Sequence, residues 1–175
     1  MDCMPGPARL SSAAVMFTPA LASQTTGPRR VETFNAGVLQ VQADSLVQLV
    51  EPLPGLGPDR EFLVYRSAPG PLSWWQSTSR KDLALCCLEP FAAGLDPDMA
   101  IEAAHAEAVG ASGPDDIIVF TIVVLEQDAS QTRTNLRAPI LVGKRSGKAL
   151  QVVLDDARLP VRGYLADLVA RAAKA

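Results

Sequence analysis

The sequence predicts a mainly β protein: a small single-domain, β-barrel-like fold with one internal helix and a C-terminal helix. Two observations lead to this prediction. From residue 31 onward, apolar residues come in short β-leaning runs separated by Gly-, Pro- and Asp-containing breaks, a pattern typical of strands joined by turns. Only two segments carry apolar side chains at helical spacing. A chain of 175 residues has room for one ordinary domain of this kind.

The expected strands follow one another along the chain. Short breaks at 36–37 and 43–44 predict two successive tight hairpins among the first three strands. The Pro- and Gly-rich segment 53–58 predicts a loop, because proline lacks a backbone donor and cannot continue a ladder. Runs that are apolar on both faces, at 83–88 and 116–126, favour central positions. The expected strands are residues 31–35, 38–42, 45–50, 61–67, 83–88, 116–126 and 148–154.

The one clear internal helix is expected at residues 97–109. Asp96 can cap its start, and Pro97 suits the first helical position. Gly110 suits the exit, because glycine adopts the left-handed conformation that ends many helices. A second helix is expected over residues 161–174, where Leu, Val and Ala recur at helical spacing. The narrow apolar stripe of the first helix consists of Ile101, Ala104 and Ala108.

The domain organisation is expected to be simple. Residues 1–30 are rich in Pro, Gly, Ser, Thr and Ala without periodicity, which predicts a disordered N-terminal extension or a misassigned start. A secretory signal is the alternative, since Arg9 precedes an apolar stretch that ends in Ala20-Leu21-Ala22. Residues 31–165 form the expected barrel domain, and residues 166–175 form the end of the C-terminal helix and the tail.

Composition excludes several classes of function. The formal net charge is −3, and the Lys and Arg residues are scattered, which argues against direct nucleic-acid binding. The chain has no 18-residue apolar run, so no membrane helix is expected. Its three cysteines form no framework. Cys86 and Cys87 are adjacent on an expected strand, so we expect them to point to opposite faces as small core residues in a reducing compartment.

The search for catalytic motifs favours a binding protein over an enzyme. His105-Ala106-Glu107 resembles the His-x-Glu segment of zinc deaminases, but no cysteine follows it to complete a metal site. The Gly-Lys pair in residues 143–148 lacks the spacing of a phosphate-binding loop and predicts a hairpin turn. No cofactor, no metal and no catalytic residue is therefore expected. The alternative is a small-ligand-binding or metal-dependent hydrolytic β-barrel that uses His105 with Glu102, Glu107 or the cysteine pair.

The segment Thr-Asn-Leu-Arg-Ala-Pro-Ile at 134–140 is the most informative of an ordered set of segments over about residues 31–165. It matches the Asn-Leu-x-Ala-Pro-Ile segment of the flagellar assembly factor FliW family, which the whole set resembles. Weaker similarities precede and follow it in the family's order. They are the opening hairpin at 33–37, the Leu-Pro-Gly-Leu loop at 53–56, Trp-Trp-Gln-Ser at 74–77, Glu-Pro-Phe at 89–91, Pro-Asp-Met at 97–99 and Gln-Val-Val-Leu at 151–154.

This resemblance implies a cytoplasmic protein without catalytic activity. We also expect a monomer that binds neither nucleic acid nor membrane directly. It implies binding to the translational regulator CsrA, which relieves repression of flagellin mRNA. It also implies binding to flagellin near the C-terminal end of flagellin, so that the two proteins exchange in a partner switch. The net charge of −3 fits a basic, RNA-binding partner.

The partner-binding residues expected from these segments lie in three places along the chain. Trp74 or Trp75 is a candidate exposed anchor, because adjacent residues on an extended segment face opposite ways; the alternative buries both partly under the loop at 69–71. Asn135 is expected to contact a partner, or alternatively to form a turn by bonding its own backbone. The alternative for Arg137 is a charge exposed to solvent, and the alternative for the loop at 53–56 is a purely structural turn. The full expected set is Leu53, Gly55, Trp74, Trp75, Gln76, Ser77, Asn135 and Arg137.

Overall fold

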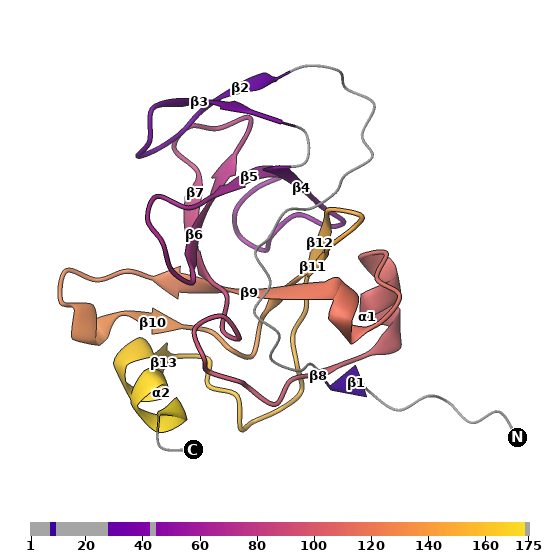
Figure 1. Cartoon of the computed structure of the whole chain (residues 1–175), viewed down its shortest axis with the longest axis vertical. Helices are drawn as coiled ribbons and strands as arrows, with labels where there is room; N and C mark the ends of the chain where they lie inside the picture. The colour runs from indigo at the N-terminus through magenta and orange to yellow at the C-terminus, as the bar shows by residue number, and fades with distance from the viewer. Residues whose placement is uncertain (1–7, 10–27, 43–44, 174–175) are drawn as a thin grey trace, which may run out of the picture.

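The computed structural model describes residues 8–9, 28–42 and 45–173, and seven of its strands close into a β-barrel (Figure 1). Around the barrel the order is β11-β12-β4-β5-β6-β7-β9, and pairing of β9 with β11 closes the ring. All neighbours are antiparallel except β12 and β4. The predicted mainly β, barrel-like fold is confirmed. These strands are β4 (Leu46–Leu49), β5 (Glu61–Tyr65), β6 (Leu72–Ser77), β7 (Ala84–Leu88), β9 (Ile117–Val124), β11 (Ile140–Gly143) and β12 (Lys148–Gln151).

Shorter elements surround the barrel. One two-stranded sheet is an antiparallel hairpin, another pairs β1 with β8, and β10 and β13 extend the main sheet from β9. These elements are β1 (Ala8–Arg9), β2 (Arg29–Glu32), β3 (Val38–Val41), β8 (Ala100–Ile101), β10 (Arg133–Thr134) and β13 (Gly163–Tyr164). The helices are α1 (Ala103–Ala108), α2 (Leu165–Ala172) and 3-10 turns at Pro114–Asp116 and Ala129–Gln131.

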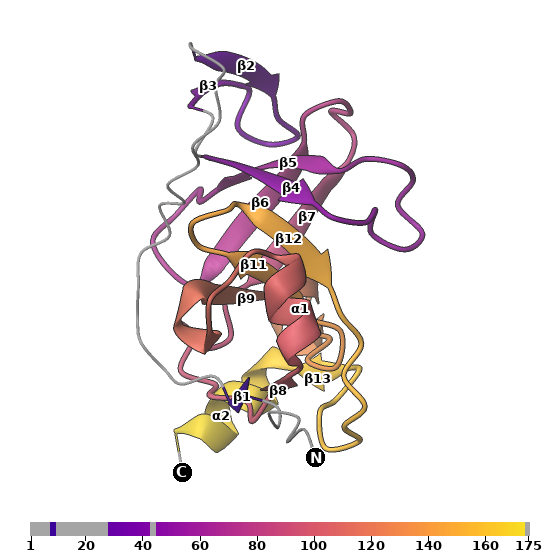
Figure 2. The same ribbon diagram turned by 90° about the vertical axis from the view of Figure 1, so that its right-hand side faces the viewer.

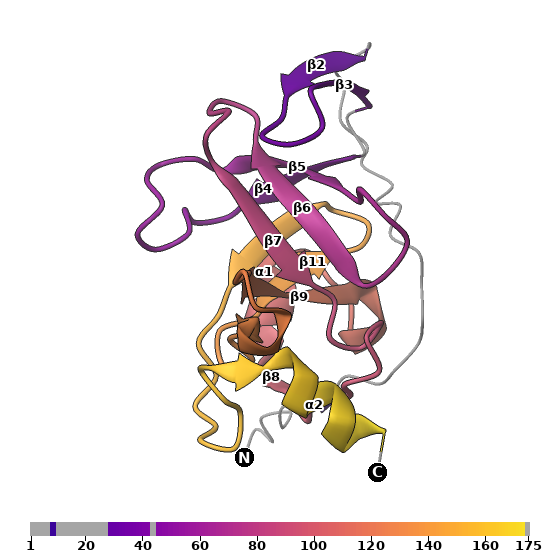
Figure 3. The same ribbon diagram turned by 90° about the vertical axis from the view of Figure 1, so that its left-hand side faces the viewer.

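The views agree on how these elements lie around the barrel. The β2–β3 hairpin lies at one end of the molecule, and α2 lies near β8 and β13 at the other (Figures 1 and 3). Helix α1 covers a side of the barrel beside β11 (Figure 2). No helix in the described ranges is long and apolar enough to cross a membrane.

Trp75 lies at the centre of the barrel. It is 0% exposed, and its ring centroid lies 5.1 Å from that of Phe120 and 6.3 Å from that of Phe62. Cys87 belongs to the same interior cluster, whereas Cys86 lies on the outer face of β7 with Leu88 and Val123. The prediction that the two cysteines are small core residues on opposite faces is confirmed, and both are free.

A second core forms between the barrel wall and the segments outside it. Val119 and Leu141 contribute the outer faces of β9 and β11. Val109, immediately after α1, is 0% exposed in this cluster. Through this cluster, α1 and residues 152–159, which follow β12, pack against the barrel wall. Its other buried members are Met99, Ile101, Ile117, Leu136, Val152, Leu154 and Leu159.

The internal helix is shorter than predicted. Asp96 has a positive φ of 37° and does not cap it; the helix begins at Ala103. Residues 100–101 form the short strand β8 instead, and Pro97, Met99 and Ile101 are buried while the residues between them are exposed. Burial with a period of two is the mark of a strand. The capping signals were therefore outweighed by tertiary packing of alternate side chains. The C-terminal helix is confirmed, with a later start at Leu165.

Of the two predicted hairpins, only the first exists. β2 pairs with β3, but β4 pairs with β5 and β12; residues 43–44 lie outside the described ranges. Strand β4 buries three of its four residues, whereas β3 buries one, and this difference places β4 in the barrel wall. Strand β6 was only foreseen as an extended segment. The predicted N-terminal extension lies mostly outside the described residues and stays a prediction.

Candidate functional site

The residues expected to bind a partner fall into two regions of the structure. Leu53, Trp75, Gln76 and Ser77 are all buried, in β6 and the loop that packs beside it. In this conformation their side chains have almost no surface to offer a partner, so direct contact through them is not supported. Leu53 and Trp75 belong to the barrel core, whereas the side chains of Gln76 and Ser77 hydrogen-bond to neighbouring loops. Gly55 is exposed, and partner contact at that position stays a prediction.

Trp74 does not form an exposed anchor. Its side chain is half-buried on the outer face of β6, packed against the cluster that contains Cys86 and Leu88. Leu165 of α2 packs against the same cluster. Trp75 is fully buried inside the barrel and Trp74 is partly buried against this outer cluster, so the alternative that places both partly under the loop at 69–71 does not describe them either. Trp74 instead helps to seat the C-terminal helix on the barrel.

Gln76 is a buried connector between two loops. Its side-chain Oε1 accepts a hydrogen bond from the backbone N–H of Phe34 at 2.7 Å. Its Nε2 donates to the carbonyl oxygens of Arg80 at 2.8 Å, Leu83 at 3.1 Å and Lys81 at 3.2 Å. Gln76 thus ties the β2–β3 hairpin to the β6–β7 turn. Phe34, whose backbone is held in this way, presents a side chain that is 63% exposed.

The loop at 53–60 is a structural turn, as its alternative predicted. Leu56 donates its backbone N–H to the carbonyl of Leu53 at 3.2 Å. Gly55 has a φ of +80°, which suits the third position of a type II turn that begins with Leu53 and Pro54. Leu53 itself is in the barrel core. The turn therefore anchors the loop from inside.

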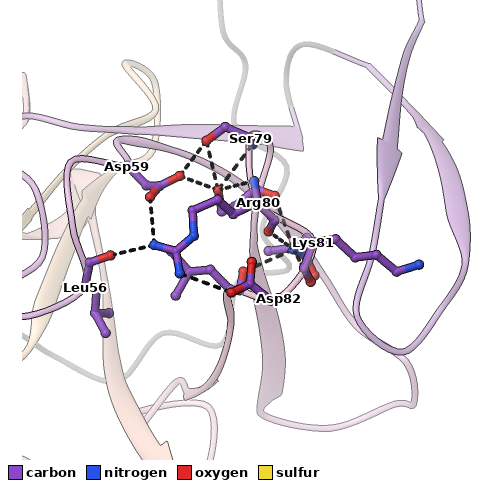
Figure 4. Close-up of polar contacts among 9 residues, drawn as sticks. Leu56, Asp59, Ser79, Arg80, Lys81 and Asp82 are labelled. Carbon is purple, nitrogen blue, oxygen red and sulfur yellow. Dashed lines mark hydrogen bonds and ion pairs between the residues drawn. The ribbon is translucent and has the colours of Figure 1, made fainter.

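A polar cluster anchors the same loop from outside (Figure 4). Asp59 accepts hydrogen bonds from the hydroxyls of Ser77 at 2.7 Å and Ser79 at 2.5 Å. Arg80 donates to the carbonyl of Leu56 at 3.2 Å and pairs with Asp59 at 3.4 Å. A second pair, with Asp82 at 3.3 Å, orients the guanidinium. The cluster joins the 53–60 loop to the β6–β7 turn.

The hydrogen bond from Ser79, and then that from Ser77, lower the pKa of Asp59. A carboxylate with a lowered folded-state pKa stabilises the fold above its unfolded-state pKa and loses that contribution as pH falls through the folded value. Between about pH 6 and about pH 3 we expect the stability advantage of wild type over Asp59→Asn to shrink. Urea unfolding at several pH values measures it. Ser79→Ala is expected to show a pH dependence of the unfolding free energy between those of wild type and Asp59→Asn. The same pH dependence in wild type and Asp59→Asn would contradict the assignment.

Asn135 and Arg137 organise the connection between β10 and β11. The side-chain Oδ1 of Asn135 accepts the backbone N–H of Arg137 at 3.0 Å and that of Ala138 at 3.2 Å, which is the turn-forming role given as its alternative. Arg137 is not a free solvated charge. Its Nε donates to the carbonyl of Leu159 at 3.1 Å, and its Nη2 donates to that of Ala157 at 3.2 Å.

We expect Asn135→Ala to destabilise the protein by about 1–2 kcal/mol, because two backbone N–H groups lose their acceptor. Asn135→Asp keeps an oxygen at that position and serves as the control, with a smaller loss. Chemical denaturation of both variants gives the difference. An alanine variant as stable as wild type would mean that the turn does not depend on this side chain.

This turn opens a groove on the barrel surface. β11 pairs with residues 117–120 of β9, and β10 pairs with residues 123–124 of the same strand. The segment that connects β10 to β11 therefore bends away from β9 near residues 121–122. Ile122 lines a groove of about 340 Å³ at this position. No buried residue of the β6 region lines it. The groove is lined by Ile122, Val124, Arg133, Thr134, Asn135, Ala138, Gln151, Val161 and Arg162.

The sequence did not predict this groove, because its lining comes from segments far apart in the chain. Asn135 was the one predicted site residue that the groove contains. His105 lies half-buried on α1, and its Nδ1 has no hydrogen-bond partner among the described residues. Within the described ranges, no group of three or more His, Cys, Asp or Glu is placed to hold a metal ion. The alternative of a small-ligand-binding or metal-dependent hydrolytic β-barrel stays a hypothesis.

A family model described as FliW protein matches residues 30–165. The chain belongs to the FliW family. Similar relatives, each named flagellar assembly factor FliW, occur in Caldicellulosiruptor saccharolyticus and Caldicellulosiruptor bescii. They are 31% and 32% identical over 129 residues, covering 74% of this chain and 85% of each relative. A crystal structure of the flagellar assembly factor FliW matches with a TM-score of 0.72 and 20% identity, over 78% of this chain and 96% of that one.

Membership in the FliW family explains which sequence signal was the most informative. The segment at 134–140, on which the resemblance mainly depended, forms the turn between β10 and β11. Its conformation is held by the Asn135 amide and by backbone bonds from Val152 to Pro139 and from Leu154 to Arg137. In this FliW-family fold the segment stabilises the β10–β11 connection, and three of its residues line the groove beside it.

Proposed function

We propose that this FliW-family protein is a non-enzymatic factor that controls flagellin production by binding CsrA and flagellin in a partner switch. Binding of CsrA relieves its repression of flagellin mRNA, and flagellin, bound near its C-terminal end, displaces CsrA. The protein acts in the cytoplasm as a monomer. The single observation that carries the proposal is the match of the FliW model to residues 30–165.

Two features of the chain support this proposal. The net charge of −3 favours encounter with a basic RNA-binding protein, since complementary charge raises association rates. The described surface also carries exposed apolar side chains. Phe34 and Val38 lie on the hairpin held by Gln76, and Val124 and Val161 lie at the groove. Exposed apolar side chains of this kind suit contact with protein partners.

A switch requires the two partners to weaken each other. By linkage, flagellin must lower the affinity for CsrA by the same factor as CsrA lowers the affinity for flagellin. The test is a pull-down of the full chain with purified CsrA, with and without flagellin, followed by titration calorimetry of each pair. Capture of CsrA that flagellin reverses is the expected result. An acidic protein of similar size serves as the control for charge alone.

The other outcomes separate the parts of the proposal. Capture of flagellin without CsrA would overturn the switch and leave a flagellin-binding assembly factor. Capture of both together, without competition, would overturn displacement. Binding of neither protein in calorimetry would overturn the whole proposal.

A further inference from the structure

The groove beside the β10–β11 turn combines an apolar lining with positive charge. Ile122 and Ala138 lie in it, and Val124 and Val161 add side chains that are 44% and 50% exposed. Its volume of about 340 Å³ is at the small end for a binding pocket, with room for a few side chains of a ligand. An apolar lining that remains open to solvent gains free energy when a partner covers it.

The charge of the groove is opposite to that of the whole chain. Two arginines, Arg133 and Arg162, are among its lining residues and no Asp or Glu is, although the net charge is −3. Glu126 pairs with Arg133 at 2.7 Å. Arg162 is exposed and forms no ion pair with any residue in the described ranges. Arg162 is therefore the cation that an incoming acidic group would meet with least competition.

The polar groups of the groove also favour an occupant that accepts hydrogen bonds. Asn135 uses its oxygen on the backbone of Arg137 and Ala138. Its side-chain NH2 has no acceptor among the described residues and can donate. With the arginine, this amide provides donors beside small apolar side chains. Free nucleic acid is disfavoured, because two arginines on an acidic protein do not make a basic stripe.

We propose that this groove binds an extended peptide segment of a protein partner, in which an acidic side chain lies next to small apolar side chains. The carboxylate pairs with Arg162, and the apolar side chains cover Ile122, Val124 and Val161. This inference rests on the proposed function and assigns the segment to flagellin, because the other proposed partner, CsrA, is the basic protein. It adds the chemistry by which flagellin is recognised.

The test uses the full chain and an array of overlapping peptides that spans CsrA and flagellin. Wild type is expected to capture peptides that contain Asp or Glu beside Val, Ala or Leu. Arg162→Glu is expected to weaken that binding about tenfold, and more salt is expected to weaken binding to wild type. Arg30→Glu is the matched control. Arg30 is also exposed, and its substitution changes the charge by the same amount. It lies on β2 and is not among the residues that line the groove.

A second readout locates the bound peptide. A photo-crosslinking residue in place of Val161 is expected to label the captured peptide, whereas one in place of Val153, which is 78% exposed and does not line the groove, is not. Peptides that bind wild type and Arg162→Glu equally, or that crosslink only at Val153, would overturn the proposal. So would binding of single-stranded RNA in preference to the peptides.

These outcomes are distinct from failure of the proposed function. If full-length CsrA and flagellin bind wild type and Arg162→Glu with the same affinity, the groove proposal fails while the proposed function stands. If neither full-length protein binds wild type, the proposed function fails as well.

Discussion

Trp75→Ala is expected to lower the free energy of unfolding by about 3–5 kcal/mol, the largest loss for any single side chain in this protein. Trp75 is the largest fully buried side chain, and its ring packs edge-on against Phe120 at 5.1 Å. Removal of the indole leaves a cavity in the centre of a closed barrel, whose walls are held by strand pairing and cannot collapse around it. Denaturant unfolding followed by circular dichroism measures the loss.

Trp74→Ala is the matched control for that substitution. It removes the same side chain from the neighbouring residue, but Trp74 is half-buried on the outer face of β6. We expect a loss of about 1–2 kcal/mol, mostly from the contact with the Cys86 cluster beside α2. Equal losses for the two variants would contradict the assignment of Trp75 to the barrel centre.

Gly143→Ala is the second substitution with a large expected effect. A Cβ at this position would lie 2.1 Å from the carbonyl oxygen of Val109 and 2.5 Å from the hydroxyl of Ser146. The first of these is a backbone atom, so α1 or β11 must move. The same carbonyl accepts the Ser146 hydroxyl at 2.5 Å, and that bond would be broken or bent. We expect a loss of about 3 kcal/mol or more in denaturant unfolding.

Gly113→Ala provides the control for the loss of a glycine as such. Nothing lies within 4 Å of a Cβ built at Gly113, and its φ of 178° is extended backbone. The unfolding free energy is expected to change by less than about 1 kcal/mol. A small increase is expected where alanine lowers the conformational entropy of the unfolded chain. If both alanine variants were equally stable, close approach of α1 to β11 would not be the reason for glycine at 143.

The fold class was predictable because local patterns and tertiary environment agree over most of the chain. Strands β5, β7 and β9 were expected from apolar runs. Cys86 and Cys87 are adjacent on β7, so alternation along the strand places them on opposite faces. The segment at 97–101 is the clearest exception. Its capping residues favour a helix locally, yet Met99 and Ile101 are buried against the outer face of the barrel, and that burial outweighs the local preference.

The candidate site was predictable only in part. The segments at 53–56, 74–77 and 134–140 were recognised, but their positions relative to the surface were not. Gln76 looked like a polar contact residue, and it is a fully buried connector between two loops. Arg162, which no sequence motif marked as a site residue, lines the groove. A side chain's exposure depends on which strands close around it, and no spacing within one segment contains that information.

By itself, the sequence determined a single mainly β domain, the turns at 53–56 and 143–148, the opposite faces of Cys86 and Cys87, and the segments that resemble the FliW family. These depend on local chemistry: backbone freedom at glycine and proline, alternation along a strand, and the order of short motifs. Only the tertiary structure decided that Trp75 and Gln76 are buried and that a groove opens beside Asn135. The burial follows from closure of the barrel, and the groove follows from the pairing of β10 and β11 with different parts of one side of β9. Such pairing between distant residues is invisible to any local pattern.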